Sequence, residues 1–293
     1  MRQEYEEICR AAMSDPAHRG LAGHTRTLPE LESLAQSLAR ARGAVLISGF
    51  PVRTRWGVVG ETDGPSGIGW LAGALTRLGV PVRIYTGQNC LDQMEAARQV
   101  AAPKAELRLL PHRGGAEFAR AQLEEFCPSH LISLERPGRS ADGVCYNSKG
   151  VSIEELVADA EPLFLEAGRR GVCTIAVGDG GNELGMGRAR PLVEEYVRFG
   201  SKICARQNAD ATLVAGVSNW WGWGLCGALS LAAGQDLLPD AGQEQALLEA
   251  VLRAGGADGE TARADGTVDA MPMEVHLEVL ERMRRAVAGA LKS

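Results

Sequence analysis

The residues most capable of chemistry lie in short clusters rich in glycine and polar side chains. The densest is GDGGNELGMG at 178–187, which contains Asp179, Asn182 and Glu183. Carboxyl groups transfer protons or hold cations, and glycines let backbone N–H groups approach a ligand closely. The alternative is a turn whose polar side chains only satisfy backbone groups. Because a turn rarely needs so many of them, we predict a ligand site, with Gly180 and Gly181 supplying N–H groups.

The segment ETDGPSG at 61–67 offers two more carboxyl groups, Glu61 and Asp63, directly before an expected helix. A helix N-terminus presents free N–H groups that attract anions. The segment lacks the lysine of a GxxxxGK[ST] loop, which excludes that phosphate-binding motif. In a purely structural interpretation, Asp-Gly-Pro is a sequence typical of turns, and Ser66 caps the following helix. We favour a functional role for both acids.

Cationic side chains occur in ERPGRSADGVCYN at 135–147. Arg136 and Arg139 form a pair that can grip a carboxylate, because a guanidinium donates two parallel hydrogen bonds. The alternative is that both arginines are solvated. Lys149 points either inward or to solvent. Three neighbours are expected on the same wall of the site: Asp142, Tyr146 and Asn147.

Two further positions complete the set of candidates. Ser218 and Asn219, in AGVSNW, either contact a ligand or cap the next helix. His276 is either a general acid–base residue or a packed histidine. The three tryptophans at 220, 221 and 223 are interpreted as core packing, with a ligand contact or a homo-oligomer interface as alternatives.

Each cluster follows a short apolar run. WGVVG precedes Glu61, LISLE precedes Arg136, TIAVG precedes Asp179, and LVAGV precedes Ser218. Strands of a parallel sheet all point the same way, so we expect the four clusters to meet at the carboxyl edge, where open α/β sheets bind ligands. This convergence does not depend on any single motif.

The elements that must position these clusters alternate along the chain. Apolar runs at 44–50, 56–60, 80–87, 106–111, 130–138, 172–181 and 211–219 are separated by helical patterns. Helices are expected at 28–42, 68–79, 89–101, 115–126, 152–170 (opened by a Ser152/Glu155 capping box), 189–199, 220–234, 242–254 and 273–291. The alternation predicts an α/β fold: a mainly parallel sheet of about six strands with helices on both faces, Rossmann-like and three-layered. We expect a single domain over 1–293, with a helical extension at 1–27 and a mobile loop, disordered or a lid, at 255–272.

Composition narrows the classes of function. The 293-residue chain has a net charge of −6 without basic clusters, which argues against nucleic acid. Its seven cysteines form no CxxC pair, which is typical of reduced thiols. The N-terminus has no apolar leader pattern, and the apolar stretch at 220–234 is too short for a membrane span. We therefore expect a soluble, cytoplasmic protein with no membrane or nucleic-acid partner.

Taken in chain order, ETDGP, ERPGRSADGVCYN, VGDGGNELGMG and AGVSNW resemble the D-glutamate cyclase family, specifically its C-terminal domain. The segment MPMEVHLEVL is also similar, and the resemblance runs from about residue 40 to residue 290. It implies a stand-alone form of that domain. The implied enzyme is a lyase that dehydrates D-glutamate, a dicarboxylic amino acid, to 5-oxo-D-proline.

The implied reaction needs a neutral amine, a proton donor for the leaving oxygen and stabilisation of an oxyanion. Asp63, Asp179 and Glu183 are candidates for proton transfer, with His276 in reserve. The N–H groups near 180–182 would cradle the oxyanion, and the arginine pair would hold substrate carboxylates. Glu61, Asp63 and Asp179 are oxygen ligands that suit Mg²⁺ or Mn²⁺, although the sequence leaves metal dependence open.

Two alternatives remain. One is a phosphate-ester or phosphoryl-transfer enzyme, in which 61–67 and 178–183 serve as phosphate and Mg²⁺ loops. The other is a non-catalytic module that binds or senses a small acid. No motif encodes discrimination between D and L isomers.

Overall fold

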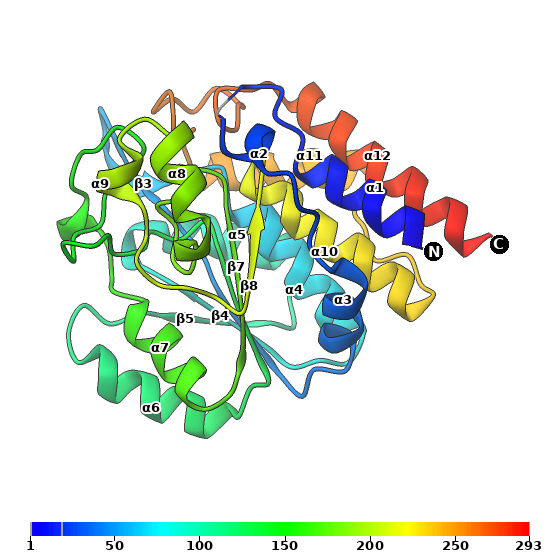
Figure 1. The fold of residues 1–293 in the computed structure, drawn as a ribbon, viewed down its shortest axis with the longest axis horizontal. Coiled ribbons are helices and arrows are strands. Elements are labelled where there is room, and N and C mark those ends of the chain that lie inside the picture. The colour runs from blue at the N-terminus through cyan, green and yellow to red at the C-terminus, as the bar shows by residue number, and fades with distance from the viewer. Residues whose placement is uncertain (1, 19, 293) are drawn as a thin grey trace.

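A six-stranded parallel sheet forms the centre of the molecule (Figure 1). The computed structural model describes residues 2–18 and 20–292. In the order β5-β4-β1-β6-β7-β8, the strands are Glu106–Leu109, Val82–Thr86, Ala44–Ile47, His130–Leu134, Cys173–Gly178 and Ala211–Val214. All neighbouring pairs are parallel. The predicted α/β class and strand number are confirmed. The order reverses between β1 and β6, the switch point at which doubly wound sheets bind ligands.

Helices cover both faces of this sheet, as predicted (Figure 1). One face packs against α1 (Arg2–Ala12), α3 (Leu31–Ala39), α4 (Pro65–Arg77), α5 (Leu91–Ala101), α10 (Ser218–Ala233), α11 (Ala241–Arg253) and α12 (Met273–Leu291). The other packs against α2 (Leu21–His24), α6 (Gly115–Phe126), α7 (Glu161–Arg169) and α8 (Arg190–Tyr196), with α9 (Gly200–Ile203) next to α8. Alternate strand residues enter the two cores: Leu46 faces the first and Val45 the second. Among residues 2–18 and 20–292, no helix combines the length and apolarity needed to cross a bilayer.

The run at 56–60 is not part of the parallel sheet, contrary to our expectation. It forms β3 (Gly57–Gly60), paired with β2 (Pro51–Thr54) in a separate antiparallel hairpin. Only residues 48–56 separate it from the end of β1, whereas a parallel neighbour needs a crossover of about a dozen residues or more. The hairpin therefore brings Glu61 and Asp63 back to the carboxyl end of β1. Both acids reach the predicted edge by a different route.

The helix predicted from Ser152 begins at Glu161 instead. Residues 154–156 form only a 3₁₀ turn, and Ser152 pairs with Tyr146 in an isolated bridge. Pro162 explains the difference, because a proline in a helix interior lacks an N–H donor and clashes with the carbonyl four residues earlier. In the first turn of α7, proline is tolerated. The predicted capping box is therefore not formed.

Segments at the two ends of the chain pack against this frame. Helix α1 lies against α10 and α12, and it buries Tyr5 and Ile8. The segment 255–272 is organised around Asp258, whose carboxylate accepts hydrogen bonds from Glu260, Thr261, Thr267 and Ala270. That the segment is mobile stays a prediction.

Helices α4 and α10 approach each other closely at two glycines. A Cβ added to Gly222 would lie 2.2 Å from the Cα of Gly67. This contact brings the N-termini of both helices together below the carboxyl edge. The three tryptophans of α10 are almost fully buried within the chain, so they are core residues and not a surface for a second subunit.

A buried carboxyl group supports this helix pair. The Oε2 atom of Glu244, on α11, accepts hydrogen bonds from Ser66 Oγ (2.7 Å) and Trp70 Nε1 (2.6 Å). Burial raises the pKa of Glu244 from 4.5 to about 7, and these hydrogen bonds offset only part of the effect. The folded chain thus retains a proton that the unfolded chain loses near pH 4.5.

We expect Glu244→Gln to stabilise the protein in a pH-dependent way. Because the folded-state pKa is raised, the stabilisation that the protonated Glu244 gives is complete below about pH 4.5 and is lost as pH rises through about 7. Glutamine avoids this loss, so the stability of the variant should differ from that of wild type by less than about 1 kcal/mol near pH 5 and should exceed it above pH 7 by up to about 3 kcal/mol. Urea unfolding at both pH values measures the difference, with the exposed Glu249→Gln on the same helix as control. A pH-independent difference would contradict the raised pKa.

Candidate active site

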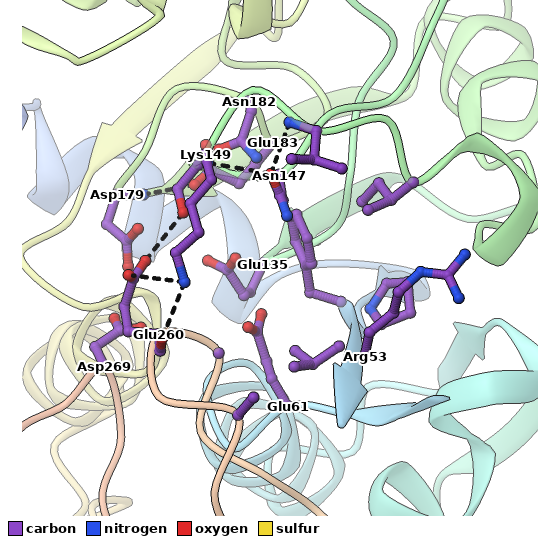
Figure 2. Close-up of a pocket in the computed structure, with 18 of the residues that line it drawn as sticks. Arg53, Glu61, Glu135, Asn147, Lys149, Asp179, Asn182, Glu183, Glu260 and Asp269 are labelled. Atoms are coloured by element: carbon purple, nitrogen blue, oxygen red, sulfur yellow. Dashed lines mark hydrogen bonds and ion pairs between the residues drawn. The ribbon is translucent and has the colours of Figure 1, made fainter. Parts of the chain in front are cut away.

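A cavity of about 250 Å³ opens at the carboxyl edge of the sheet, beside the switch point between β1 and β6 (Figure 2). Four segments form most of its wall: residues 50–53 of the hairpin, 147–153, 179–183 and 259–269. These segments are far apart in sequence, and the sheet and the hairpin bring them together. Three of the four predicted polar clusters contribute to the lining, through Glu61, Asn147 and Asp179, and the fourth contacts Asp179 through Ser218 N.

Six buried carboxyl groups gather at the base of this cavity: five of them line it, and Asp63 is next to Glu135 and Asp179 but outside the lining. We call them the carboxylate cluster: Glu61, Asp63, Glu135, Asp179, Glu183 and Asp269. Each is less than a tenth exposed. Glu135 is the first residue after β6, and Asp179 is the first after β7, so adjacent strands deliver them to the same edge. Four of the six were predicted site residues.

The N-terminus of α10 holds two members of the cluster. Ser218 N donates to Asp63 Oδ2 (2.9 Å) and to Asp179 Oδ2 (3.2 Å). Asn219 N donates to Asp63 Oδ1 (2.8 Å). Carboxylates are stabilised at this end of a helix by its free N–H groups and dipole. Ser218 and Asn219, predicted to contact substrate, thus orient Asp63 and Asp179 through their backbone.

The side chain of Asn219 is also engaged within the protein. Its Oδ1 accepts from Gly64 N (3.0 Å) and Gly67 N (2.7 Å), and its Nδ2 donates to Thr62 O (3.2 Å). Asn219 therefore ties the start of α4 to the start of α10. A role in positioning Asp63 replaces the predicted substrate contact.

Glu135 is a site residue that the sequence interpretation missed. Its φ is +45°, a left-handed conformation that costs a non-glycine residue roughly 1–3 kcal/mol. Its Oε2 is buried without a hydrogen-bond partner. One feature of the sequence could have identified Glu135 as a site residue: like Asp179, it directly follows a strand. The pattern of charged residues instead favours the two arginines that follow Glu135.

Asp269 was missed as well, because it lies in the irregular segment 255–272. Its φ is +52°, and it lines the cavity. The same segment packs closely against Glu61, since a Cβ added to Gly259 would lie 2.1 Å from Glu61 Oε2. No local pattern in the sequence indicates this approach.

Mutual proximity perturbs the acids of the cluster. Burial raises the pKa values of Glu61, Asp63 and Glu135 well above the ordinary carboxyl range. Neighbouring carboxylates raise them further: Asp269 is the strongest neighbour for Glu61 and Asp63, and Asp179 is the strongest for Glu135. A cluster of this kind retains protons until a cation or an ammonium group compensates its charge.

Three of these acids are arranged to hold a metal ion. One carboxylate oxygen each from Asp63, Glu135 and Asp179 lies within 4.8 Å of the others. Carboxylate oxygens suit Mg²⁺, Mn²⁺ or Ca²⁺. The unpartnered Oε2 of Glu135 fits a cation too, because a buried acceptor without a donor is otherwise unfavourable.

The glycine-rich loop after β7 folds back on itself. Glu183 Oε1 accepts hydrogen bonds from the N–H groups of Asp179 (3.1 Å) and Gly180 (2.8 Å). Gly181 has a φ of +83°, and a Cβ there would lie 2.3 Å from Val193. Gly180 N–H therefore binds Glu183, and Gly181 is required for packing. The Gly180 N–H is thus engaged within the loop, and an oxyanion-binding role for the Gly181 N–H stays a prediction.

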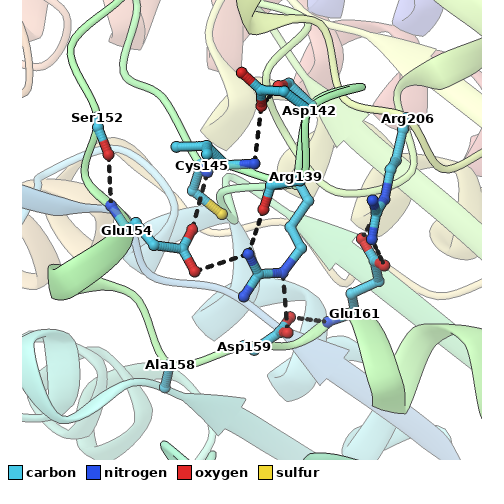
Figure 3. Close-up of polar contacts among 12 residues, drawn as sticks. Arg139, Asp142, Cys145, Ser152, Glu154, Ala158, Asp159, Glu161 and Arg206 are labelled. Carbon is cyan, nitrogen blue, oxygen red and sulfur yellow. Dashed lines mark hydrogen bonds and ion pairs between the residues drawn. The ribbon is translucent and has the colours of Figure 1, made fainter.

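Both predicted carboxylate-binding arginines lie outside the cavity lining. Arg136 is buried and donates to the carbonyl oxygens of Gly49 (2.9 Å) and Ala158. Arg139 pairs with Glu154 (2.7 Å) and Asp159 (3.0 Å), as Figure 3 shows. These contacts hold the loop between β6 and α7 in place.

The remaining predicted residues divide between lining and support. Asn147 and Asn182 line the cavity, and Asn182 Nδ2 donates to Tyr146 O (2.8 Å). The Tyr146 hydroxyl donates to Asp142 (2.7 Å), a contact inside the 135–147 loop. These two side chains therefore shape the wall from behind.

His276 is not among the residues that line the cavity. It is buried, its Nδ1 accepts from Trp220 Nε1 (2.9 Å), and its Nε2 lies 3.2 Å from Val268 O. Burial lowers its pKa, so the ring is neutral and donates to Val268. The structure thus places His276 behind the cavity, where it contacts Val268 of the segment 255–272, and an acid–base role for it stays a prediction.

Comparison with known proteins places this site in a family. A family model described as "D-glutamate cyclase-like, C-terminal" matches residues 8–284. The chain belongs to this D-glutamate cyclase-like family. The match covers all four polar clusters. It begins at residue 8, whereas the resemblance of the motifs begins at about residue 40. The matched region begins within helix α1 and includes its last five residues.

A named relative supports an enzyme of this family. "D-glutamate cyclase, mitochondrial" from Homo sapiens is 38% identical over an alignment of 229 residues, and the alignment covers 73% of this chain and 37% of the human protein. The chain thus matches a little over a third of that relative's length. The relative's name gives a mitochondrial location for the human protein, and a cytoplasmic location for this chain stays a prediction.

Proposed function

We propose that the protein dehydrates D-glutamate to 5-oxo-D-proline at the carboxylate cluster. The observation that carries this proposal is the set of buried, mutually repelling acids at the switch point of the sheet. Such a site attracts an ammonium group and a divalent cation, and it supplies proton acceptors. The family and the name of the human relative support the choice of substrate.

The size and charge of the cavity fit a small amino acid. About 250 Å³ lies just below the roughly 300–1,000 Å³ of pockets for drug-sized ligands, so a nucleotide is too large. The acidic base of the cavity favours the amino end of the substrate and disfavours a phosphate group. This charge distribution supports a cyclase over the phosphate-ester alternative.

The chemistry begins with a proton transfer. The α-ammonium of D-glutamate loses a proton to a carboxylate of the cluster. Glu61 is suited to accept it, because its raised pKa makes it a better base than an ordinary carboxylate and it is not one of the three acids proposed to hold the cation. The neutral amine then attacks the γ-carboxyl carbon and forms the new C–N bond.

The second half of the reaction removes one water molecule. The newly bonded nitrogen gives a second proton to the cluster and keeps its third as the lactam N–H. The two protons taken from nitrogen pass from the cluster to one γ-carboxylate oxygen, the C–O bond breaks, and that oxygen leaves as water. The net change is loss of water from glutamate, with no oxidant or reductant. A divalent cation held by Asp63, Glu135 and Asp179 would polarise the γ-carboxyl group and compensate the charge of the cluster.

Incubation of the purified protein with D- or L-glutamate tests this proposal. We expect 5-oxoproline from the D isomer alone, in buffer with Mg²⁺ or Mn²⁺, and none with EDTA. Chiral chromatography identifies the product. Tight binding of D-glutamate without turnover would instead identify a binding module, and turnover of phosphate esters alone would identify the other alternative.

A further inference from the structure

Two loops from distant parts of the chain meet across the mouth of the cavity. Ser148 Oγ donates to Glu260 Oε1 at 3.0 Å. Lys149 Nζ donates to the backbone oxygen of Glu260 at 3.0 Å and forms an ion pair with its Oε2 at 3.8 Å. All three residues line the cavity, and Figure 2 shows the Lys149 side chain pointing toward Glu260.

The charges along the cavity are strongly separated. The base is acidic, whereas the cationic side chains among the described lining residues are Arg53 and Lys149 at the mouth. Arg53 pairs with Glu155, which lies outside the cavity lining, whereas Glu260, the partner of Lys149, lines the cavity. Lys149, with Ser148 beside it, is therefore the cation best placed to meet an anion that enters the cavity.

The proposed reaction requires such an anion-binding position. Its amine and γ-carboxyl group must lie at the carboxylate cluster, so the α-carboxylate of the substrate must point away from the acidic base. We propose that Ser148 and Lys149 bind this α-carboxylate, and that the Glu260 carboxylate occupies the same position until substrate displaces it. This inference rests on the proposed function, and it assigns the residues that select an amino acid with a free α-carboxylate.

The contacts of Glu260 allow this exchange. The Lys149 side chain is 58% exposed and that of Glu260 is 32% exposed, and ion pairs at such exposure contribute only about 0–1 kcal/mol. The turn that carries Glu260 is fixed separately, since Glu260 N donates to Asp258 Oδ1 at 2.9 Å. The side chain can therefore leave Lys149 while its backbone stays in place.

Steady-state kinetics of three variants test the exchange. Lys149→Met should raise KM for D-glutamate about tenfold or more with little change in kcat, because it removes a charge-assisted contact. Glu260→Gln should lower KM up to about fivefold, because it removes a competing charge. In Lys149→Met/Glu260→Gln, the benefit of the second change should disappear. The exposed Lys104→Met, outside the cavity, is the matched control and should behave as wild type.

A substrate analogue identifies the group that Lys149 contacts. D-isoglutamine keeps the amine and the γ-carboxylate but has an amide in place of the α-carboxylate. Wild type should prefer D-glutamate over this analogue in kcat/KM, and Lys149→Met should lose most of that preference. A merely structural role for Lys149 would lower the activity toward both compounds equally and would overturn the assignment.

The double variant distinguishes two ways in which Glu260 could weaken substrate binding: by competing for Lys149, or by repelling the substrate through its negative charge. If Glu260→Gln lowers KM equally with and without Lys149, Glu260 acts through its charge alone and the exchange is wrong. If wild type turns over neither glutamate isomer, the proposed function fails instead. Calorimetry then measures the affinity of wild type and of the same variants for D-glutamate. If Glu260 and substrate compete for Lys149, Lys149→Met should bind D-glutamate more weakly than wild type, and Glu260→Gln should bind it more tightly. Equal affinities in all of these proteins would overturn the exchange.

Discussion

Asp179→Asn is expected to slow 5-oxo-D-proline formation by at least about 10²–10³-fold while the chain remains folded. Asparagine keeps one oxygen to accept the hydrogen bond from Ser218 N, so the N-terminus of α10 retains this contact. It removes one negative charge and one of three oxygen ligands from the proposed cation site. Turnover and circular dichroism of the purified variant measure both parts of the prediction.

The stability of this variant provides an independent readout. Because Asp179 raises the pKa values of Glu61, Asp63 and Glu135, its loss relieves repulsion in the cluster. In EDTA the variant should be at least as stable as wild type. Asp92→Asn, at an exposed position on α5, serves as control. Full activity in Asp179→Asn would show that the carboxylate cluster is not the reaction centre.

Divalent cations are expected to stabilise the protein, and more strongly at higher pH. The folded-state pKa values of Glu61, Asp63 and Glu135 are raised, so the stabilisation from their protonated forms is present at low pH and lost as pH rises through those values. A cation replaces the lost protons. At about 100 times Kd it should contribute about 2.7 kcal/mol near pH 8, and less near pH 5.5 where protons compete.

Thermal denaturation with EDTA, Mg²⁺ or Mn²⁺ measures this effect. Glu135→Gln is the decisive variant, because it removes the charge of an unpartnered buried acceptor. It should be more stable than wild type in EDTA near pH 8 and should lose most of the shift caused by cations. Comparison of the two proteins cancels the separate pH effect of Glu244. An equal cation shift in both would place the ion elsewhere.

Much of the frame follows from the sequence because parallel strands impose simple geometry. Apolar runs of four to six residues that alternate with amphipathic helices leave few folds other than a doubly wound sheet. Once that sheet is accepted, residues that follow its strands must meet at one edge. This reasoning identifies Asp179 and Glu183. Asp63 reaches the same edge through the β2–β3 hairpin, because the segment after β1 is too short for the crossover that a parallel strand needs.

The roles of individual side chains were harder to predict, because they depend on contacts between distant segments. Arg136 and Arg139 have the right chemistry for a carboxylate, yet backbone carbonyls and Asp159 take up their donors. Asp269 joins the cluster only because Asp258 shapes the preceding turn and His276 anchors Val268. The spacing of residues along the sequence does not predict such contacts between distant segments.

Crystals soaked in Mn²⁺ and 5-oxo-D-proline decide whether the carboxylate cluster is the reaction centre. Anomalous scattering locates the ion independently of any assumption about the ligand. We predict a single strong peak within about 2.0–2.6 Å of carboxylate oxygens from Asp63, Glu135 and Asp179, with the product beside it and its carboxylate toward Lys149. A peak elsewhere, or none in a protein whose turnover requires Mn²⁺, would contradict this assignment.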